Sequence, residues 1–420
     1  MVDRYILTLL VQPLKAELGV SDFQLGLLIG VAFAVLYSLV GIPIAQAIDR
    51  GRRKVILAGG VILWSAATIL SGLATDYAHL FVLRAGVAIG EAVLTPAAVS
   101  LIADMFDRNE RALPTSIYMA VSGIMGTGAF AVGGVALDLA EALAPSLGLP
   151  PWRAALILVG APGVLLAVLI ILTVAEPQRR VEGPSAQDPA SQKGWSYLIA
   201  NRRLYLPFYL GVGVLNIFSM GLVAWLTTFL VRAHGIEPAE AGYLFSIAGV
   251  PAGAFGSFLW PWIAGKLEAR GRADASFVLL AVTAVLVVPL AWLVPAAPSA
   301  TITALLVGVI IVVVSANTTL PLLIIQAAGP GWIRGRLTAI CLLAYGLIGL
   351  ALGPVLVAGL GERLPQSPRA LGLSLALTAT GAGLTACGCF LAACKPYRHS
   401  VENLAAGLPA SSPVYEAQNG

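Results

Sequence analysis

Four charged side chains lie within otherwise apolar stretches of the sequence, and their types could bind anions and move protons. They are Asp3, Arg4, Arg84 and Glu91. A charged side chain at the centre of an apolar helix costs on the order of 2.5 to 3.5 kcal/mol on insertion scales, so each of the four needs a reason to be there. Arg84 and Glu91 are seven residues apart, which places them on one helix face, about 10 Å apart along the axis.

Together these groups could couple proton binding to anion binding. Apolar surroundings favour the neutral form of a carboxylic acid, whereas a neighbouring guanidinium favours the carboxylate. An anion that engages the guanidinium would therefore leave the carboxylate free to take up a proton. The alternative is a static cluster of ion pairs that pins the helix carrying Asp3 to the helix carrying Arg84, although apolar packing would serve that purpose as well.

The elements that must position these charges are long apolar segments. Hydrophobic residues make up 58% of the 420 residues and charged residues only 11%, with a mean hydropathy of +0.89, whereas soluble chains carry about 25% charged residues. This composition indicates an all-α integral membrane protein and gives no sign of nucleic-acid binding. Segments of about 19 or more mostly apolar residues are long enough to cross roughly 30 Å of hydrocarbon. Eleven such segments are predicted, at approximately Phe23–Ile48, Val55–Thr75, His79–Ala103, Pro114–Leu137, Trp152–Val174, Leu204–Val231, Ala241–Gly265, Ser276–Val294, Thr301–Ala327, Leu337–Leu360 and Arg369–Ala393.

Basic residues gather in alternate loops and so predict the sidedness of the chain. Of the 25 Lys and Arg residues, 18 lie in DRGRRK, DRNER, EPQRRVEGPSAQDPASQKGWSYLIANRR, GKLEARGR, IRGR and CKPYRH. The opposite loops hold Lys15, Arg153, Arg232, Arg363 and Arg369. By the positive-inside rule the first set is cytoplasmic, so the segment 23–48 runs from outside to inside.

A segment before residue 23 must therefore already have crossed the membrane. The apolar run Tyr5–Val11 spans only about 10 Å as a helix. We expect Asp3 and Arg4 to lie near the middle of a first helix whose N-terminal half is missing from this chain, most simply because the start codon is assigned too late. The alternative is a short interfacial start, with both charges among the lipid headgroups. The complete first helix would bring the count to twelve.

The loop between the second and third segments of such a count resembles a signature of the major facilitator superfamily. That signature is Gly, three residues, Asp-Arg, two residues and Arg-Lys, and it is matched by Asp49, Arg50, Arg53 and Lys54, with Ala45 in place of the leading Gly. The chain resembles the Spinster-like branch more closely. The motifs that carry this resemblance are VDRY at 2–5, RAGVAIGEA at 84–92, ADMF at 103–106, Trp152-Arg153 and Glu176-Pro177.

The resemblance implies a twelve-helix fold of two six-helix bundles. We expect an N-terminal bundle at 1–175 with an incomplete first helix, a cytoplasmic linker at 176–200, a C-terminal bundle at 201–395 and a disordered, polar cytoplasmic tail at 396–420. The resemblance also assigns proton coupling to Asp3 and Glu91, and the holding of an anionic substrate group to Arg4 and Arg84.

The resemblance further implies a cytoplasmic latch that joins the bundles when the transporter opens outward. Its candidate residues are Asp49, Arg50, Arg53, Asp104 and Arg111. The alternative is a solvated loop that only fixes the orientation of the chain.

Polar and aromatic residues of the second half are candidates for the substrate surface. They are Asn216, Trp225, Asn317 and Tyr345, and each could equally be a packing or interfacial residue. The four cysteines at 341, 387, 389 and 394 fit small core side chains better than metal ligands or disulfides.

The function that follows is transport rather than catalysis. No nucleophile, metal-ligand or Walker pattern supports an enzyme or an ATP-driven pump. We expect a secondary active, proton-coupled transporter of an amphipathic or organic anion that works by alternating access, without a cofactor, as a monomer among membrane lipids. The resemblance implies a cell inner membrane location, with both termini of the full-length protein cytoplasmic. The alternatives are a uniporter or drug-type exporter whose charge cluster is structural, or a transporter-like membrane sensor.

Overall fold

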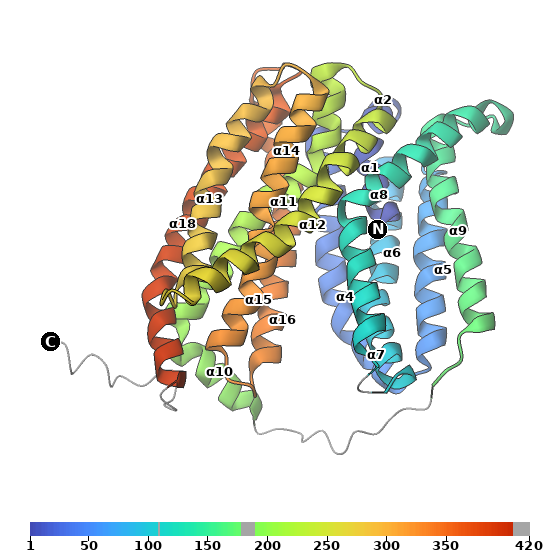
Figure 1. Cartoon of the computed structure of the whole chain (residues 1–420). Coiled ribbons are helices and arrows are strands. Elements are labelled where there is room, and N and C mark those ends of the chain that lie inside the picture. The colour runs from blue at the N-terminus through green and yellow to red at the C-terminus, as the bar shows by residue number, and fades with distance from the viewer. Residues whose placement is uncertain (108–109, 178–189, 406–420) are drawn as a thin grey trace.

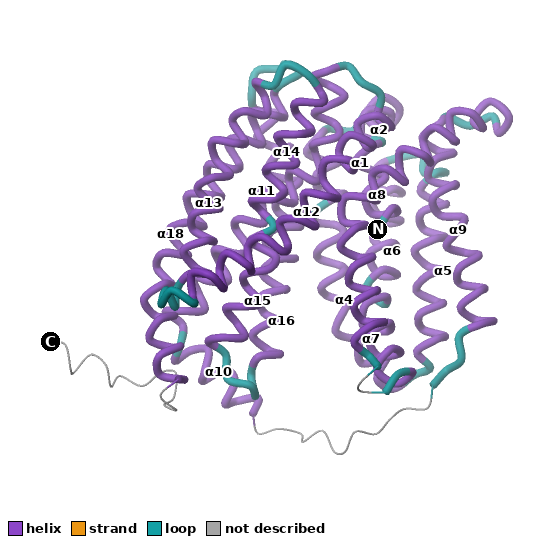
Figure 2. Tube along the Cα trace, viewed as in Figure 1, coloured by secondary structure: helices purple, strands orange, loops and turns teal. Residues whose placement is uncertain are grey.

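The computed structural model describes residues 1–107, 110–177 and 190–405, and every regular element in these ranges is a helix (Figure 1). Figure 2 shows that short loops join the helices. A helix satisfies its backbone hydrogen bonds internally, which is the requirement that a lipid environment imposes. Eleven helical stretches in the described ranges are long and apolar enough to cross a membrane, and they correspond to the eleven predicted segments.

The helices that precede the linker are α1 (Val2–Leu9), α2 (Val11–Leu18), α3 (Asp22–Ile29), α4 (Val31–Arg50), α5 (Arg53–Ser71), α6 (Tyr77–Glu91), α7 (Leu94–Met105), α8 (Ala112–Leu147) and α9 (Pro151–Thr173). Those that follow are α10 (Ala190–Ala200), α11 (Arg202–His234), α12 (Pro238–Glu268), α13 (Ala275–Leu293), α14 (Ala300–Val314), α15 (Ala316–Ala328), α16 (Arg334–Ala344), α17 (Ala351–Arg363) and α18 (Ala370–Ala405). A 3-10 turn, η1 (Val294–Ala296), follows α13, and a π-helix, η2 (Tyr345–Leu350), joins α16 to α17.

The first helix lies inside the molecule. Ile6, Leu7 and Leu10 are each at most 3% exposed, and Figure 1 places the N-terminus at mid-height, beside α6 and α8. The ring of Tyr5 stacks on Phe130 of α8 at 5.1 Å between centroids. Asp3 and Arg4 precede these buried residues on the same helix and are themselves half-buried.

The helices before and after the linker form two groups that lie side by side (Figure 1). They meet where α3 packs against α17, α8 against α12 and α1 against α11. Gly26 permits the close approach of α3 to α17, because a Cβ atom there would lie 2.9 Å from the carbonyl oxygen of Pro354 and 3.2 Å from Cβ of Ala358. The two groups are therefore in backbone contact on the side of the molecule away from the linker.

Two segments that the sequence predicts to be irregular contain helix. Residues 190–200 of the predicted linker form α10, and α18 continues to Ala405, beyond the predicted end at residue 393. The extension is stabilised by Tyr397, which is 2% exposed and lies 5.0 Å from the Phe277 ring, and by Arg398, which donates to Asp274 at 2.6 Å. The prediction of a disordered tail was wrong for residues 396–405, whereas residues 406–420 and 178–189 lie outside the described ranges.

Candidate functional site

Arg84 is the most buried of the four predicted charges. It lies on α6 and is 2% exposed. Its Nη1 donates to the carbonyl oxygen of Asp3 at 2.8 Å and its Nη2 to that of Arg4 at 2.6 Å, while its Nε has no partner among the described residues. The Arg84 guanidinium thus binds the backbone of α1 rather than a carboxylate side chain.

The four predicted charges form one electrostatic group. Arg84 interacts with the charges of Asp3, Arg4 and Glu91, and Asp3 also interacts with Glu91. Oδ1 of Asp3 is buried without a hydrogen-bond partner in the part of the chain that the structure describes. An Oε1 atom of Glu91 lies 3.3 Å from the amino group of Met1. The structure therefore brings together all four residues that the sequence singled out at mid-helix.

Arg4 extends over aromatic rings toward a small pocket. Its guanidinium lies 4.5 Å from the ring centroid of Phe33 and 5.5 Å from that of Tyr5. The pocket measures about 10 Å³, which is room for about one water molecule. Residues from both halves line it, namely Arg4, Tyr5, Thr8, Ile29, Met220, Val223, Ala224, Leu350 and Pro354. One charged residue thus lines an otherwise mainly apolar space between the halves.

Three of the four candidates in the second half donate to backbone carbonyl groups. Nδ2 of Asn216 donates to Tyr345 O at 2.8 Å and Nδ2 of Asn317 to Val212 O at 3.1 Å. Nε1 of Trp225 donates to a carbonyl of α17 at 2.8 Å. Oδ1 of both Asn residues is buried without a partner within the described ranges, so each amide retains an unused acceptor.

The fourth candidate, Tyr345, begins the π-helix η2. A π-turn widens the helix and releases carbonyl groups from the regular pattern, and such turns are frequent at functional sites. The Asn216 amide fits there because Gly349 has no side chain: a Cβ atom at Gly349 would lie 2.2 Å from Nδ2 of Asn216. Asn216 and Gly349 together therefore support this irregular turn.

Arg53 organises the polar contacts near the linker. It is 2% exposed, forms an ion pair with Asp104 of α7 and donates to Glu176 Oε1 at 3.2 Å. Glu176 also accepts the backbone N–H groups of Arg53 and Lys54 at 3.1 and 2.8 Å, at the start of α5. Burial alone would raise the pKa of Glu176, but these bonds outweigh it and hold the pKa below its usual value. These contacts join α5 and α7 to the first residue of the linker.

Among the described residues, Asp49, Arg50 and Arg111 form no ion pair with Arg53. Asp49 and Arg50 are exposed, and no ion pair joins them to Arg53 or Asp104 in the described structure. Nε of Arg111 donates to the carbonyl oxygen of Phe106 at 3.2 Å. The structure thus joins two of the five predicted residues and adds Glu176, which the sequence reading had noted only as part of a motif.

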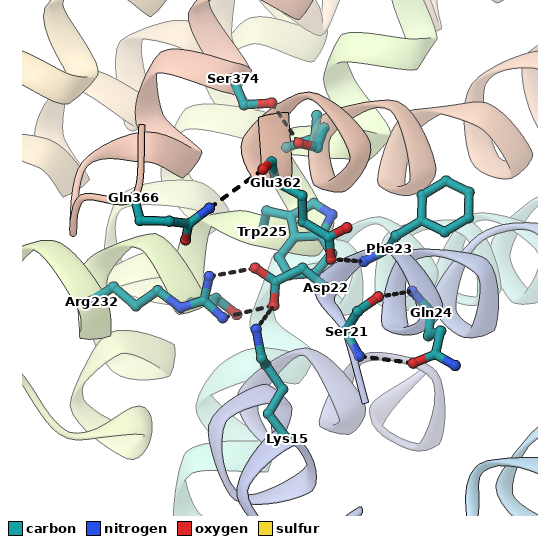
Figure 3. A network of polar contacts seen from close by, with 12 residues as sticks. Lys15, Ser21, Asp22, Phe23, Gln24, Trp225, Arg232, Glu362, Gln366 and Ser374 are labelled. Carbon is teal, nitrogen blue, oxygen red and sulfur yellow. Dashed lines mark hydrogen bonds and ion pairs between the residues drawn. The ribbon is translucent and has the colours of Figure 1, made fainter. Parts of the chain in front are cut away.

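A second polar network joins the two halves on the side away from the linker (Figure 3). Asp22, at the start of α3, accepts from Arg232 of α11 at 2.6 and 2.8 Å and from Lys15 of α2 at 2.7 Å. The backbone N–H of Phe23 donates to Glu362 of α17 at 2.8 Å. A two-pronged contact of guanidinium and carboxylate fixes geometry as well as adding energy. We refer to Asp22, Arg232, Lys15 and Glu362 as the outer network.

Further contacts between the halves lie on the same side. Thr227 and Thr228 of α11 donate to the carbonyl oxygen of Thr8 at 3.1 and 3.4 Å. Tyr243 of α12 donates to Asp138 of α8 at 2.5 Å. The outer network could not be predicted from the sequence, because charged residues at the ends of membrane segments are ordinarily solvated. One sequence feature does point to this network. Basic residues are scarce in the loops on this side, so the few that occur there, such as Lys15 and Arg232, are candidate ion-pair partners for Asp22.

Comparison with known proteins identifies the family. The model of the Major Facilitator Superfamily matches residues 1–354. An MFS-type efflux pump of Mycolicibacterium smegmatis is 30% identical over 285 residues, covering 68% of this chain and 64% of the relative. A probable L-galactonate transporter of Escherichia coli is 28% identical, covering 59% of this chain and 56% of the relative. The chain thus spans less than two thirds of the length of these two relatives.

The solved structures extend the likeness along the chain. A bacterial homologue of the human lysosomal transporter Spinster, in an inward-facing and unoccupied conformation, is 26% identical, with a TM-score of 0.78. The match covers 98% of this chain and 95% of the homologue. The predicted resemblance to the Spinster-like branch is therefore confirmed. The family match over residues 1–354 and the shared helical architecture show that the chain belongs to the Major Facilitator Superfamily.

Proposed function

We propose that the protein is a secondary active transporter that moves an amphipathic or organic anion by alternating access, coupled to protons. The observation that carries this proposal is the grouping of Asp3, Arg4, Arg84 and Glu91, in which Arg84 is buried against the backbone of residues 3 and 4 and Arg4 lines a pocket shared by the two halves. Ionisable residues within a membrane protein are expensive, and they mark substrate paths and proton relays.

In the proposed mechanism Arg4 takes the anionic group of the substrate. Arg4 lines the pocket, whereas two nitrogens of Arg84 already donate to α1. Arg84 contributes positive charge and its unpaired Nε. Binding of an anion reduces the positive field at Asp3 and Glu91, and so makes a proton easier for either carboxylate to hold. Release of the anion reverses this effect.

The second half would complete the substrate surface. The Oδ1 atoms of Asn216 and Asn317, which are buried without a partner among the described residues, would accept hydrogen bonds from the substrate, and Tyr345 would contribute a ring and a hydroxyl group at the π-helix. Trp225 would support the surface through its bond to α17. A mainly apolar pocket that contains one arginine suits a substrate with an anionic group and an apolar part. The relative named as a probable L-galactonate transporter supports the organic-anion class.

We propose that residues 1–175 and 201–395 rock against each other as two bundles of a monomer in a cell inner membrane. By the positive-inside rule, the linker and the C-terminus would lie in the cytoplasm. The outer network would then close the external side, which fits an inward-facing state. The cytoplasmic gate in the opposite state would be formed by Asp49, Arg50, Arg53, Asp104 and Arg111. Arg53 and Asp104 are already paired with each other in the first half.

One observation favours a second candidate, a uniporter or exporter with a structural charge cluster. Arg84 places two of its hydrogen bonds on the carbonyl groups of α1, an arrangement that could serve only to hold α1 against α6. In that case substrate movement would not require a titrating carboxylate.

Proton flux into proteoliposomes separates the two candidates. The wild-type protein and Glu91→Gln are compared under an imposed pH gradient, with L-galactonate and a lysophospholipid as probes. The proposal expects anion-dependent proton movement in the wild type and at least a tenfold loss in Glu91→Gln. Glu141→Gln is the matched control, because Glu141 lies exposed on α8. Anion transport without proton movement in the wild type would support the second candidate instead.

A further inference from the structure

An open cavity of about 490 Å³ lies where α10 meets α11. Its lining consists of Ser196, Ile199, Ala200, Arg202 and Arg203. None of these residues belongs to the charged group at α1 and α6 or to the outer network. Two arginines and a hydroxyl group on the wall of one cavity, with an isoleucine beside them, present both positive charge and apolar surface.

The cavity is held in place because α10 docks on the second half by its other face. The ring of Tyr197 lies 6.0 Å from that of Tyr205 and 5.7 Å from that of Trp332. The amide of Asn201 donates to Tyr197 O at 2.9 Å, at the junction of the two helices. The opposite face of α10 points outward, where Trp195 is 61% and Ile199 is 59% exposed.

The cavity lies at the start of a helix that contains a candidate membrane span. Helix α11 contains a candidate membrane span and begins at Arg202, so the two arginines lie at one end of a helix that is long enough to cross a membrane. On the same side of the molecule, Lys266 at the end of α12 lies 3.8 Å from the ring centroid of Trp262. Tryptophans and basic residues of this kind are enriched at the boundary between lipid and water. Exposed Trp195 and Ile199 would then contact lipid rather than bulk water.

We propose that this cavity binds the phosphate headgroup of an anionic phospholipid. Arg202 and Arg203 hold the phosphate oxygens, because the planar guanidinium presents paired donors that match them. Ser196 supplies a further hydroxyl group, and Trp195 and Ile199 contact the upper part of the acyl chains. The choice of a lipid rests on this apolar rim, and on the proposed orientation, which places the cavity at the anionic cytoplasmic leaflet.

Lipid binding can be measured without any transport assay. The detergent-solubilised protein is titrated with phosphatidylglycerol and, separately, with phosphatidylcholine, and bound lipid is counted by native mass spectrometry. We expect the first phosphatidylglycerol to bind the wild type at least tenfold more tightly than phosphatidylcholine does. The double variant Arg202→Gln and Arg203→Gln should weaken that binding about 30-fold. Each basic side chain near an anionic surface contributes roughly fivefold to the affinity, and the two factors multiply.

The matched control removes the same charge elsewhere on the same side. Arg52 and Arg270 are exposed and do not line the cavity, so Arg52→Gln with Arg270→Gln should leave phosphatidylglycerol binding within twofold of the wild type. If the double variant at 202 and 203 does not fold, each single variant is tested for its fivefold loss. Equal losses in the control pair would overturn the site, and so would full displacement of the lipid by inorganic phosphate at equal concentration. Loss of proton coupling in Glu91→Gln leaves this result unaffected.

Discussion

At the scale of single residues, the positions of charge within helices carry most of the functional information. Arg84 and Glu91 stand out from the sequence because a charge in an apolar helix needs a reason. Their partners could not be predicted, because Arg84 donates to backbone carbonyl groups of α1, which every residue possesses. Asp22 was missed for the opposite reason: an acidic residue at the start of a helix is common and ordinarily needs no special explanation.

Glu176 gives a prediction about acid stability. Its pKa is held below the usual 4.5, so its bonds to Arg53 and Lys54 stabilise the protein fully above pH 4.5. That contribution is lost as the pH falls through the lower value of the folded state. Glu176→Gln should therefore lower the thermal unfolding midpoint at pH 7 and show a smaller further loss than the wild type on acidification to pH 3.5.

The control for Glu176 is Glu237→Gln, an exposed carboxylate at the start of α12. It should unfold at the wild-type midpoint at pH 7 and lose stability with acid as the wild type does. If Glu176→Gln followed the same curve as this control, the network around Arg53 would have no role in stability.

At the scale of elements, the sequence predicts the spanning helices but not their irregular turns. Long apolar runs defined eleven segments that the structure confirms. The π-helix at 345–350 depends on Asn216 from another helix, and such a contact cannot be predicted from a local sequence pattern. The helical extension of α18 depends likewise on the distant Phe277 and Asp274.

Substitution of Gly349 tests the support of the π-helix. A Cβ atom at this position would lie 2.6 Å from Cβ of Asn216, so Gly349→Ala should destabilise the protein by about 1 to 3 kcal/mol through overpacking. Asn216→Ala should also destabilise, because it removes the bond to Tyr345 O. The double variant should lose less unfolding free energy than the sum of the losses in the two single variants, as measured by denaturant or thermal unfolding. Strict additivity would show that the two residues do not act on one turn.

The outer network makes a prediction about conformation. Asp22→Asn removes the carboxylate that holds Arg232 and Lys15, and hydrogen bonds to charged groups contribute about 1.5 to 3 kcal/mol. The ratio of externally open to externally closed molecules should rise at least about tenfold. Spin labels at Ala78→Cys and Ser367→Cys, with the four natural cysteines replaced by alanine, report the distance between the halves on this side.

Glu17→Gln is a matched control for the outer network. Glu17 accepts from Arg153 at 2.7 Å and from Trp152 at 2.5 Å, and both partners belong to the first half. Burial opposes these bonds, but they outweigh it and lower the pKa of Glu17, so its side chain is charged at neutral pH. The control should leave the distance between labels unchanged. An equal change in both variants would mean that the outer network does not gate the external side.

At the scale of the whole molecule, composition and basic loops predict a polytopic helical protein, but not how the two halves are placed. The same apolar segments would satisfy the membrane in an outward-open or an inward-open arrangement, because rocking exchanges contacts without changing which residues face lipid. The contacts through Gly26 and Asp22 fix the arrangement seen here. They are specific pairings between distant residues, so hydropathy alone cannot predict them.

The central claim is that protonation of the charged group sets the balance between the two arrangements. Double electron–electron resonance can test it, with the external labels at 78 and 367 and a second pair at Arg52→Cys and Arg270→Cys on the linker side. In the wild type, lowering the pH should change the two distances in opposite directions. Glu91→Gln should remove this pH dependence, alone or together with Asp3→Asn. Unaltered pH dependence in the double carboxylate variant would contradict the account.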